Sequence, residues 1–267
     1  MNTSYYNLGI DAGSVAIKVV IFDASANQIV ASSICPTGWN IIESANIAME
    51  MALQTAKISQ ADIHTIVATG YGRISIPFAH FQKAEISCHA LGAHHLHANT
   101  RLILDIGGQD TKAIHLDELG NVIDFMMNDK CAAGTGRFVQ TISHVLDMNL
   151  EEFDQAVSVD HPVPISSTCT VFAETEIVGL LAQKVPVSNI AAGVLYAIAK
   201  RMKSICGRLL HHISSENETI LFSGGMTHMS SFVKILGKEL GTPLYIPEKA
   251  QFTGALGAAL FAQKNHR

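Results

Sequence analysis

Apolar residues fall into two kinds of run along the chain. Short β-branched runs bounded by glycine or polar turns predict strands at residues 7–13, 15–25, 26–30, 64–70, 219–226 and 243–247. Segments with apolar residues at helical spacing predict helices at residues 40–59, 136–148, 188–210 and 254–264. Because strands and helices alternate, the sequence predicts an α/β fold.

One strand-turn-strand pattern occurs twice, at a constant offset of 94 residues. The offset aligns Asp11 with Asp105, Gly13 with Gly107, Lys18 with Lys112, Asp23 with Asp117, Asn27 with Asn121 and Ile29 with Ile123. Such a duplication predicts two lobes of similar architecture. We expect the first lobe at residues 1–98, completed by a closing helix at about 248–267, and the second at 99–247.

Both copies of the repeat place an aspartate at the end of an apolar strand with glycines directly after it. Asp11 stands in "IDAGS" and Asp105 in "LDIGGQD", and a third glycine turn, "FSGGM", covers residues 222–226. Glycines let backbone N–H groups approach a phosphate closely. Each aspartate would lie beside a hydrated Mg²⁺, since like charges need a cation between them. The alternative reading of each turn is a plain hairpin.

Composition narrows the class of protein. With 48% hydrophobic and 15% charged residues, the chain can bury a sizeable core. The net charge of -5 gives no reason to expect nucleic acid or an anionic membrane as partner. The N-terminus has no secretory signal pattern, and no apolar run approaches the roughly 20 residues of a membrane span. We therefore expect a cytoplasmic protein, where an odd number of cysteines argues against a disulfide framework.

The three glycine turns resemble the PHOSPHATE 1, PHOSPHATE 2 and ADENOSINE segments of the superfamily that contains actin, sugar kinases and heat-shock ATPases. That resemblance implies a duplicated actin-like, ribonuclease H-like fold with ATP or ADP in a cleft between two lobes. It assigns Asp11, Gly13 and Ser14 to one phosphate turn, Asp105, Gly107, Gly108 and Gln109 to the other, and Gly224 and Gly225 to the adenosine side.

Polar side chains in and shortly after the two turns also have candidate roles. Lys18 would reach the phosphates, although the stronger reading of Lys18 and Lys112 is as solvated strand residues or ion-pair partners. Gln109 or Asp110 could orient the attacking water, as such residues do in other nucleotide hydrolases.

Two cysteines stand before predicted helices. Cys131 precedes "AAGTGRF", and Cys169 lies in "SSTCTVFAETE", where Ser167 or Thr168 would cap a helix. The early turns of that helix carry Glu174 and Glu176, acids favoured near the positive end of the dipole. A position near a helix N-terminus favours the thiolate that a metal requires.

The number of matched cysteines bears on the kind of metal site. Iron–sulfur clusters usually take four thiolates, so two cysteines per chain would need a second copy on a twofold axis. Buried structural thiols or a redox disulfide are the alternatives. Cys35, Cys88 and Cys206 fit the reading as buried thiols.

Six motifs together resemble the activator component of 2-hydroxyacyl-CoA dehydratases, in the BadF/BadG/BcrA/BcrD ATPase family that includes the ATPase subunits of benzoyl-CoA reductase. They are "NDKCAAGTGRF", "SSTCTVFAETE", "ATGYGR", "EISCHALGA", "LDIGGQDTK" and "GALGAAL". The resemblance runs from Ile10 to Leu260.

This resemblance implies a homodimer with one [4Fe–4S] cluster held by Cys131 and Cys169 of both subunits. Each subunit would bind ATP with Mg²⁺, and hydrolysis would drive one electron at low potential to a partner. The partner would be an iron–sulfur dehydratase or a double-cubane-type reductase of anaerobic metabolism, and ferredoxin or flavodoxin would supply the electron. Gly134 and Gly136 are either places of movement or a helix-starting turn packed against another backbone.

Other functions fit the sequence less well. A sugar or N-acetylhexosamine kinase of the same superfamily is the leading alternative, but it would gain nothing from Cys131 and Cys169. A nucleotide-gated scaffold protein would not explain the two cysteines either. His94 and His97 could share a helix face in a metal site, although a solvated or partly buried helix face is the simpler reading.

Overall fold

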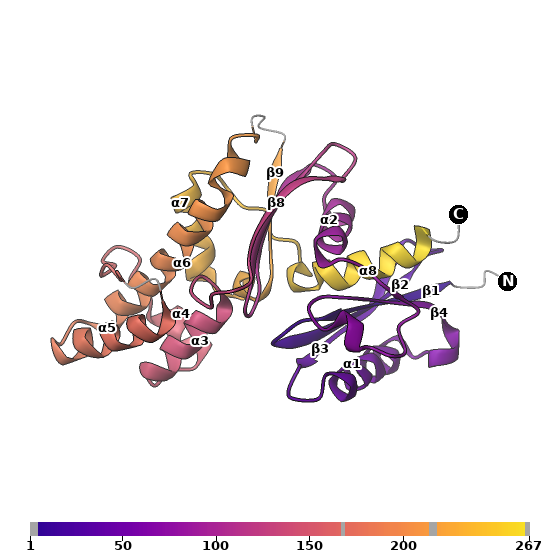
Figure 1. The fold of residues 1–267 in the computed structure, drawn as a ribbon, viewed down its shortest axis with the longest axis horizontal. Helices are drawn as coiled ribbons and strands as arrows, with labels where there is room; N and C mark the ends of the chain where they lie inside the picture. The colour runs from indigo at the N-terminus through magenta and orange to yellow at the C-terminus, as the bar shows by residue number, and fades with distance from the viewer. Residues whose placement is uncertain (1–4, 167–168, 214–217, 265–267) are drawn as a thin grey trace. The chain divides into compact units, whose positions relative to one another are not determined.

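The structure is a computed structural model and describes residues 5–166, 169–213 and 218–264 (Figure 1). It contains two compact units. Unit 1 comprises Met1–Ile103, Ile114–Asp124 and Glu248–Arg267, and unit 2 comprises Leu104–Ala113 and Phe125–Pro247. The predicted lobe boundaries at 98/99 and 247/248 stay a prediction.

The sheet of unit 1 has five strands in the order β3-β2-β1-β4-β5. β1 pairs antiparallel with β2 and parallel with β4, while β2 pairs antiparallel with β3 and β4 pairs parallel with β5. The strands are β1 (Tyr6–Ala12), β2 (Ala16–Asp23), β3 (Gln28–Pro36), β4 (Ile63–Thr69) and β5 (Phe81–Gln82). The first three confirm the predicted strand-turn-strand unit.

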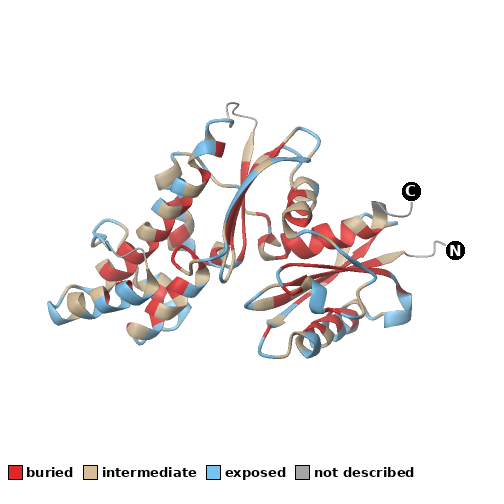
Figure 2. Cartoon of the chain, viewed as in Figure 1, coloured by how far each residue is buried: buried red, intermediate tan, exposed pale blue. Residues whose placement is uncertain are grey.

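Helices pack on this sheet and bury its central strands. α1 (Ile41–Ala56) and α8 (Thr253–Lys264) each contribute to an apolar cluster with sheet residues. Leu8 and Ile10 of β1 belong to the cluster with α1, and Val20 and Phe22 of β2 belong to the cluster with α8. Figure 2 shows α8 buried along most of its length. Strands covered in this way read as nearly continuous apolar runs.

Backbones meet closely where α8 crosses α2 (Glu85–Leu96). A Cβ on Gly257 would lie 1.8 Å from the Cys88 carbonyl oxygen, and one on Gly92 would lie 2.0 Å from the Thr253 carbonyl oxygen. No side chain fits at either position. The glycines in "EISCHALGA" and "GALGAAL" therefore serve this helix crossing.

The second sheet has four strands in the order β8-β7-β6-β9. They are β6 (Thr100–Ile106), β7 (Thr111–Leu116), β8 (Val122–Asn128) and β9 (Thr219–Ser223). The first three strands of each sheet occupy matching positions of the repeat, and β6 follows β1 at the predicted offset. Figure 1 shows the two sheets, and their architecture confirms the predicted α/β class.

Within the described residues, unit 2 contains five helices, and three of them confirm predicted helices. They are α3 (Gly136–Val145), α4 (Leu150–Ala156), α5 (Thr170–Ala182), α6 (Val187–Leu210) and α7 (Ser230–Leu240).

Short 3₁₀ helices occur at η1 (Gln60–Asp62), η2 (Arg73–Ser75), η3 (Gly225–His228) and η4 (Ala250–Phe252). Among the helices of the described ranges, none is long and apolar enough to cross a membrane.

The strand predicted at residues 243–247 is wrong. Only an isolated bridge forms there, between Tyr245 and Leu221 of β9. Pro243 and Pro247 lack the N–H that a ladder needs, so the pairing cannot extend in either direction.

Candidate functional site

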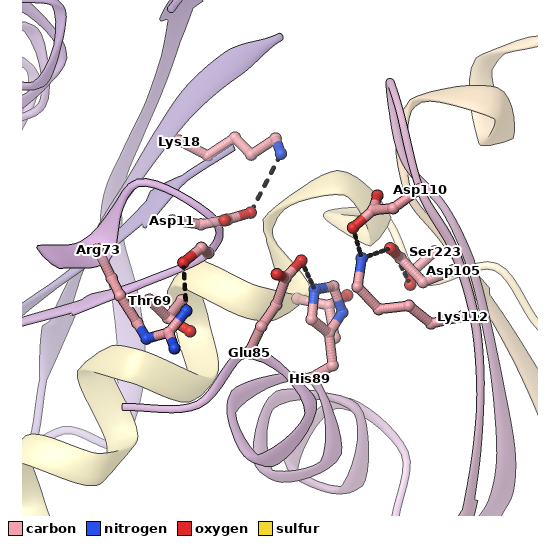
Figure 3. Close-up of polar contacts among 12 residues, drawn as sticks. Asp11, Lys18, Thr69, Arg73, Glu85, His89, Asp105, Asp110, Lys112 and Ser223 are labelled. Atoms are coloured by element: carbon pink, nitrogen blue, oxygen red, sulfur yellow. Dashed lines mark hydrogen bonds and ion pairs between the residues drawn. The ribbon is translucent and has the colours of Figure 1, made fainter. Parts of the chain in front are cut away.

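The aspartate turn of unit 1 lies at the end of β1. Asp11 is 3% exposed, and its Oδ2 accepts a 3.1 Å ion-paired hydrogen bond from the Lys18 Nζ (Figure 3). Its Oδ1 is buried without a hydrogen-bond partner within the part of the chain that the structure describes. Gly13 and Ser14 form the turn that follows, and Ser14 is exposed. A buried carboxylate oxygen with no protein donor fits a hydrated cation as its missing partner.

The aspartate turn of unit 2 has the same Asp–Lys pair with more partners. The Lys112 Nζ lies 3.2 Å from Asp105 Oδ2 and 2.6 Å from Asp110 Oδ2, and the Ser223 hydroxyl donates to Asp105 Oδ1 at 2.7 Å. Lys112 is only 1% exposed, so its charge needs these carboxylates nearby. Figure 3 shows the four side chains converging. Both lysines are thus ion-pair partners, and phosphate binding by Lys18 stays a prediction.

Two neighbouring residues of the second turn differ in solvent exposure and in their contacts. Gln109 is exposed, whereas Asp110 is held by Lys112 and its carboxylate folds back over Gly107. Orientation of the attacking water by Gln109 or Asp110 stays a prediction. Ser223 was missed by sequence reasoning, although it directly precedes the double glycine of "FSGGM".

Hydrogen bonds join the second turn to the segment that leads from Cys131 into α3. The N–H groups of Gly136 and Arg137 donate to the carbonyls of Gly107 and Gly108 at 2.9 and 2.8 Å. The Thr111 hydroxyl donates to the Gly134 carbonyl at 2.8 Å.

The geometry of the two glycines after Cys131 supports close packing. A Cβ on Gly136 would lie 3.2 Å from the Gly107 carbonyl oxygen, so the backbone approaches the phosphate turn. Gly134 has φ +92, where side chains are rarely tolerated. Movement at these positions stays a prediction.

Gly224 brings the predicted adenosine segment to the same turn. Its φ is +92, and a Cβ on it would lie 2.2 Å from the Ile106 carbonyl oxygen, at the end of the strand that carries Asp105. Gly225 is exposed and begins η3. The structure therefore gathers Asp105, Gly107 and Gly224 at one end of the second sheet.

Cys131 and Cys169 are partly exposed thiols near helix starts. Cys169 is the N-cap of α5, and Cys131 lies in the segment before the α3 N-cap, Thr135. Ser167 and Thr168, the predicted caps, lie outside the described residues. The first turn of α5 carries no acidic residue, so Glu174 and Glu176 fall in later turns than a dipole effect requires. Glu176 instead accepts hydrogen bonds from the Ser166 N–H and hydroxyl.

The other three cysteines are less available as thiolates. Burial raises the pKa of Cys88 to about 12 and that of Cys206 to about 11, and it also raises the pKa of Cys35. All five cysteines lie within the described residues and are free thiols. The prediction of buried thiols is confirmed for Cys88 and Cys206, while Cys35 is only partly buried.

One chain does not supply a complete cluster site from its described residues. No group of three or more histidine, cysteine or acidic side chains suited to a metal gathers within those ranges. His94 packs its ring against Gly120. Two accessible thiols per chain nevertheless fit half of a four-thiolate set, which a second copy would complete.

The duplicated sheets and paired aspartate turns define an ATPase of the actin-like fold. The model of the BadF/BadG/BcrA/BcrD ATPase family matches residues 8–262. The chain belongs to that family.

Two relatives of high coverage are named as activators. The 2-hydroxyisocaproyl-CoA dehydratase activator of Clostridioides difficile is 37% identical over 96% of this chain and 94% of its own length. The activator of lactoyl-CoA dehydratase from Anaerotignum propionicum is 41% identical over 96% of this chain and 97% of its own length.

A solved structure agrees with these relatives. Component A of the (R)-2-hydroxyglutaryl-CoA dehydratase of Acidaminococcus fermentans superposes with a TM-score of 0.90 at 36% identity, covering 98% of this chain and 99% of its own. A hexokinase of the ROK family from Thermus thermophilus reaches a TM-score of 0.54 at 15% identity. That likeness shows the fold alone, so it gives the kinase alternative no further support.

Proposed function

We propose that the protein is an activator in which ATP hydrolysis drives one electron from a [4Fe–4S] cluster to a partner 2-hydroxyacyl-CoA dehydratase or double-cubane-type reductase. The observation that carries the proposal is the direct hydrogen bonding between the Gly107–Gly108 turn and the segment after Cys131. An ATPase used for phosphoryl transfer to a sugar would have no reason to connect a phosphate turn to a partly exposed thiol. The named relatives, all but full-length matches, support the same role.

The cluster would be shared by a homodimer, with Cys131 and Cys169 of each chain as ligands. Both thiols are partly exposed, whereas burial raises the pKa of the other three. Since a ligand must be a thiolate, the accessible pair is the better donor set. When bound, the cluster would hold and release a single electron, which ferredoxin or flavodoxin would supply.

The aspartate turn of each unit would bind nucleotide phosphate through its backbone. In unit 1, Gly13 and Ser14 would face the phosphates, and Asp11 would hold the water shell of Mg²⁺ with its unpartnered Oδ1. Lys18 would offset the negative charge from its place beside Asp11.

The turn of unit 2 would provide the remaining contacts. Gly107 and Gly108 would donate N–H groups, Asp105 would stand near the cation, and Gln109 or Asp110 would orient the attacking water. At Gly224 and Gly225 the backbone would lie against the adenosine, because glycine has no side chain to keep it away.

Nucleotide state would reach the cysteines through α3. A shift of the Gly107–Gly108 turn on loss of the γ-phosphate would move the N–H groups of Gly136 and Arg137, which donate to it. Thr111 would transmit the same shift to Gly134, three residues from Cys131. A nucleotide changes a conformational equilibrium only by its differential affinity for the two states, and these contacts would carry that difference from the turn to the cysteine segment.

Anaerobic purification followed by iron and sulfide analysis tests the proposal. We expect about four irons per dimer, lost in Cys131→Ala and retained in the matched control Cys35→Ala. An iron-free dimer that transfers phosphate from ATP to a sugar would contradict it.

A further inference from the structure

Two titratable residues of α2 lie beside Asp11 but have no part in the site described so far. Glu85 opens α2, and His89 follows one helical turn later on the same face. The His89 Nε2 lies 3.8 Å from the Glu85 Oε1. Figure 3 shows the two side chains projecting from α2 with their polar ends facing one another.

The start of α2 is fixed next to the end of β1 by backbone contacts. The Lys83 N–H donates to the Ala68 carbonyl at 2.9 Å, and the Thr69 hydroxyl donates to the Lys83 carbonyl at 3.1 Å. Thr69 is the parallel partner of Asp11 in the sheet. The chain therefore enters α2 directly beside the aspartate turn of unit 1.

Gly254 of α8 shows how close His89 comes to Asp11. The position that a Cβ would take on Gly254 lies 3.0 Å from the His89 Nε2 and 3.4 Å from the Asp11 Oδ2. The imidazole and the carboxylate thus converge on one point of the α8 backbone. A Cβ there would crowd the imidazole and touch the carboxylate.

Charge and exposure separate the two carboxylates. Burial raises the pKa of Cys88, the residue before His89, and the charges of Asp11 and Glu85 add to that rise, so both carboxylates lie near this point of α2. The side chain of Asp11 is 5% exposed and ion-paired with Lys18, whereas that of Glu85 is 21% exposed. Of the two, Glu85 has the freer access to water.

We propose that Glu85 accepts a proton from the water that attacks the γ-phosphate of ATP, with His89 as the positioning residue that holds its carboxylate. The water oxygen bonds to the γ-phosphorus, the bond from that phosphorus to the bridging oxygen breaks, and ADP leaves with the bonding pair. The proton taken up by Glu85 then passes to phosphate or bulk water. This inference rests on the ATP hydrolysis of the proposed function but needs no cluster.

The test compares steady-state ATP hydrolysis by the full-length protein and its variants. Glu85→Gln keeps the shape of the side chain and removes the base, so we expect kcat to fall at least about 100-fold while KM for ATP stays nearly unchanged. Glu50→Gln, on the exposed side of α1, is the matched control and should hydrolyse ATP normally. His89→Gln should lower kcat less than Glu85→Gln.

A purely structural role for Glu85, as an acid in the first turn of α2, predicts a different result. Glu85→Gln would then lower thermal stability and ADP affinity while a saturated enzyme kept its kcat, and that outcome would overturn the proposal. Glu85→Asp, which keeps a carboxylate one methylene shorter, should be slowed with KM retained. If Glu85→Gln does not fold, a wild-type kcat in Glu85→Asp would overturn the proposal instead.

The two proposals fail separately. A dimer without iron whose hydrolysis depends on Glu85 would contradict electron transfer and leave the role of Glu85 standing. If the wild-type dimer holds iron and the Glu85→Gln variant hydrolyses ATP at the wild-type rate, the role of Glu85 is contradicted and electron transfer is left standing.

Discussion

Thr111→Val removes one link between the phosphate turn of unit 2 and the segment after Cys131. Thr111 is 1% exposed, and its hydroxyl donates to the buried Gly134 carbonyl at 2.8 Å. Valine has nearly the same shape, so the substitution leaves that carbonyl without its side-chain donor and creates no cavity. A carbonyl left in this way costs about 1–3 kcal/mol of unfolding free energy.

The same free energy bounds the coupling that this bond can transmit. A coupling of about 1–3 kcal/mol corresponds to a change in affinity or exposure of about 5–150-fold. In protein prepared without iron, the assay is the rate at which a maleimide labels Cys131 with ADP and with a non-hydrolysable ATP analogue. We expect the two rates to differ in the wild type and to converge in Thr111→Val.

Thr111→Ser is the matched control, because it keeps the hydroxyl and loses only a methyl group. It should keep the nucleotide effect on Cys131 despite some loss of stability. Wild-type labelling rates that are equal with both nucleotides would refute the reasoning. So would a Thr111→Val protein that is less stable in urea and yet shows the full nucleotide effect.

Two further predictions concern cysteines and glycines. A raised pKa keeps a thiol neutral and unreactive, and the pKa of Cys88 is about 12. Iodoacetamide at pH 8 should therefore modify Cys131 and Cys169 well before Cys88, as followed by mass spectrometry of the native protein. Modification of Cys88 first would count against its assigned burial. Gly134→Ala places a Cβ 2.7 Å from the Arg201 Cδ at φ +92, so it should lower the free energy of unfolding, measured in urea, by about 1–3 kcal/mol. Gly207→Ala, in open space within α6, should raise the same free energy by about 0.5–1 kcal/mol. Equal effects of the two substitutions would show that the left-handed backbone at Gly134 carries no strain.

The repeat made much of the fold predictable from sequence. In each copy of the repeat, the aspartate and the lysine are seven residues apart. Residues at that spacing face one another across a tight turn between antiparallel strands. The aligned pairs therefore indicate both where the paired strands end and which ion pairs join them. Lys18 and Asp11 are such partners in the sheet register, and Lys112 repeats the pairing with Asp105. Local pattern and tertiary structure agree at these positions.

Contacts between distant segments were not predictable in the same way. Glu85 and His89 stood in a quoted motif, but their place beside Asp11 depends on the packing of α2 against α8, which periodicity does not encode. Ser223 and Thr111 likewise gain their roles from partners far along the chain. The strand expected around Tyr245 failed for a reason that the sequence does contain, since Pro243 and Pro247 lack the backbone N–H groups of a full ladder.

The central claim is that the nucleotide controls release of the electron. The most direct measurement is the rate at which the anaerobically reduced dimer passes its electron to a low-potential viologen, followed with Mg·ATP, with Mg·ADP and without nucleotide. The account predicts faster transfer with Mg·ATP than in the other two conditions, and no transferable electron in Cys131→Ala. Equal rates in all three conditions would contradict it.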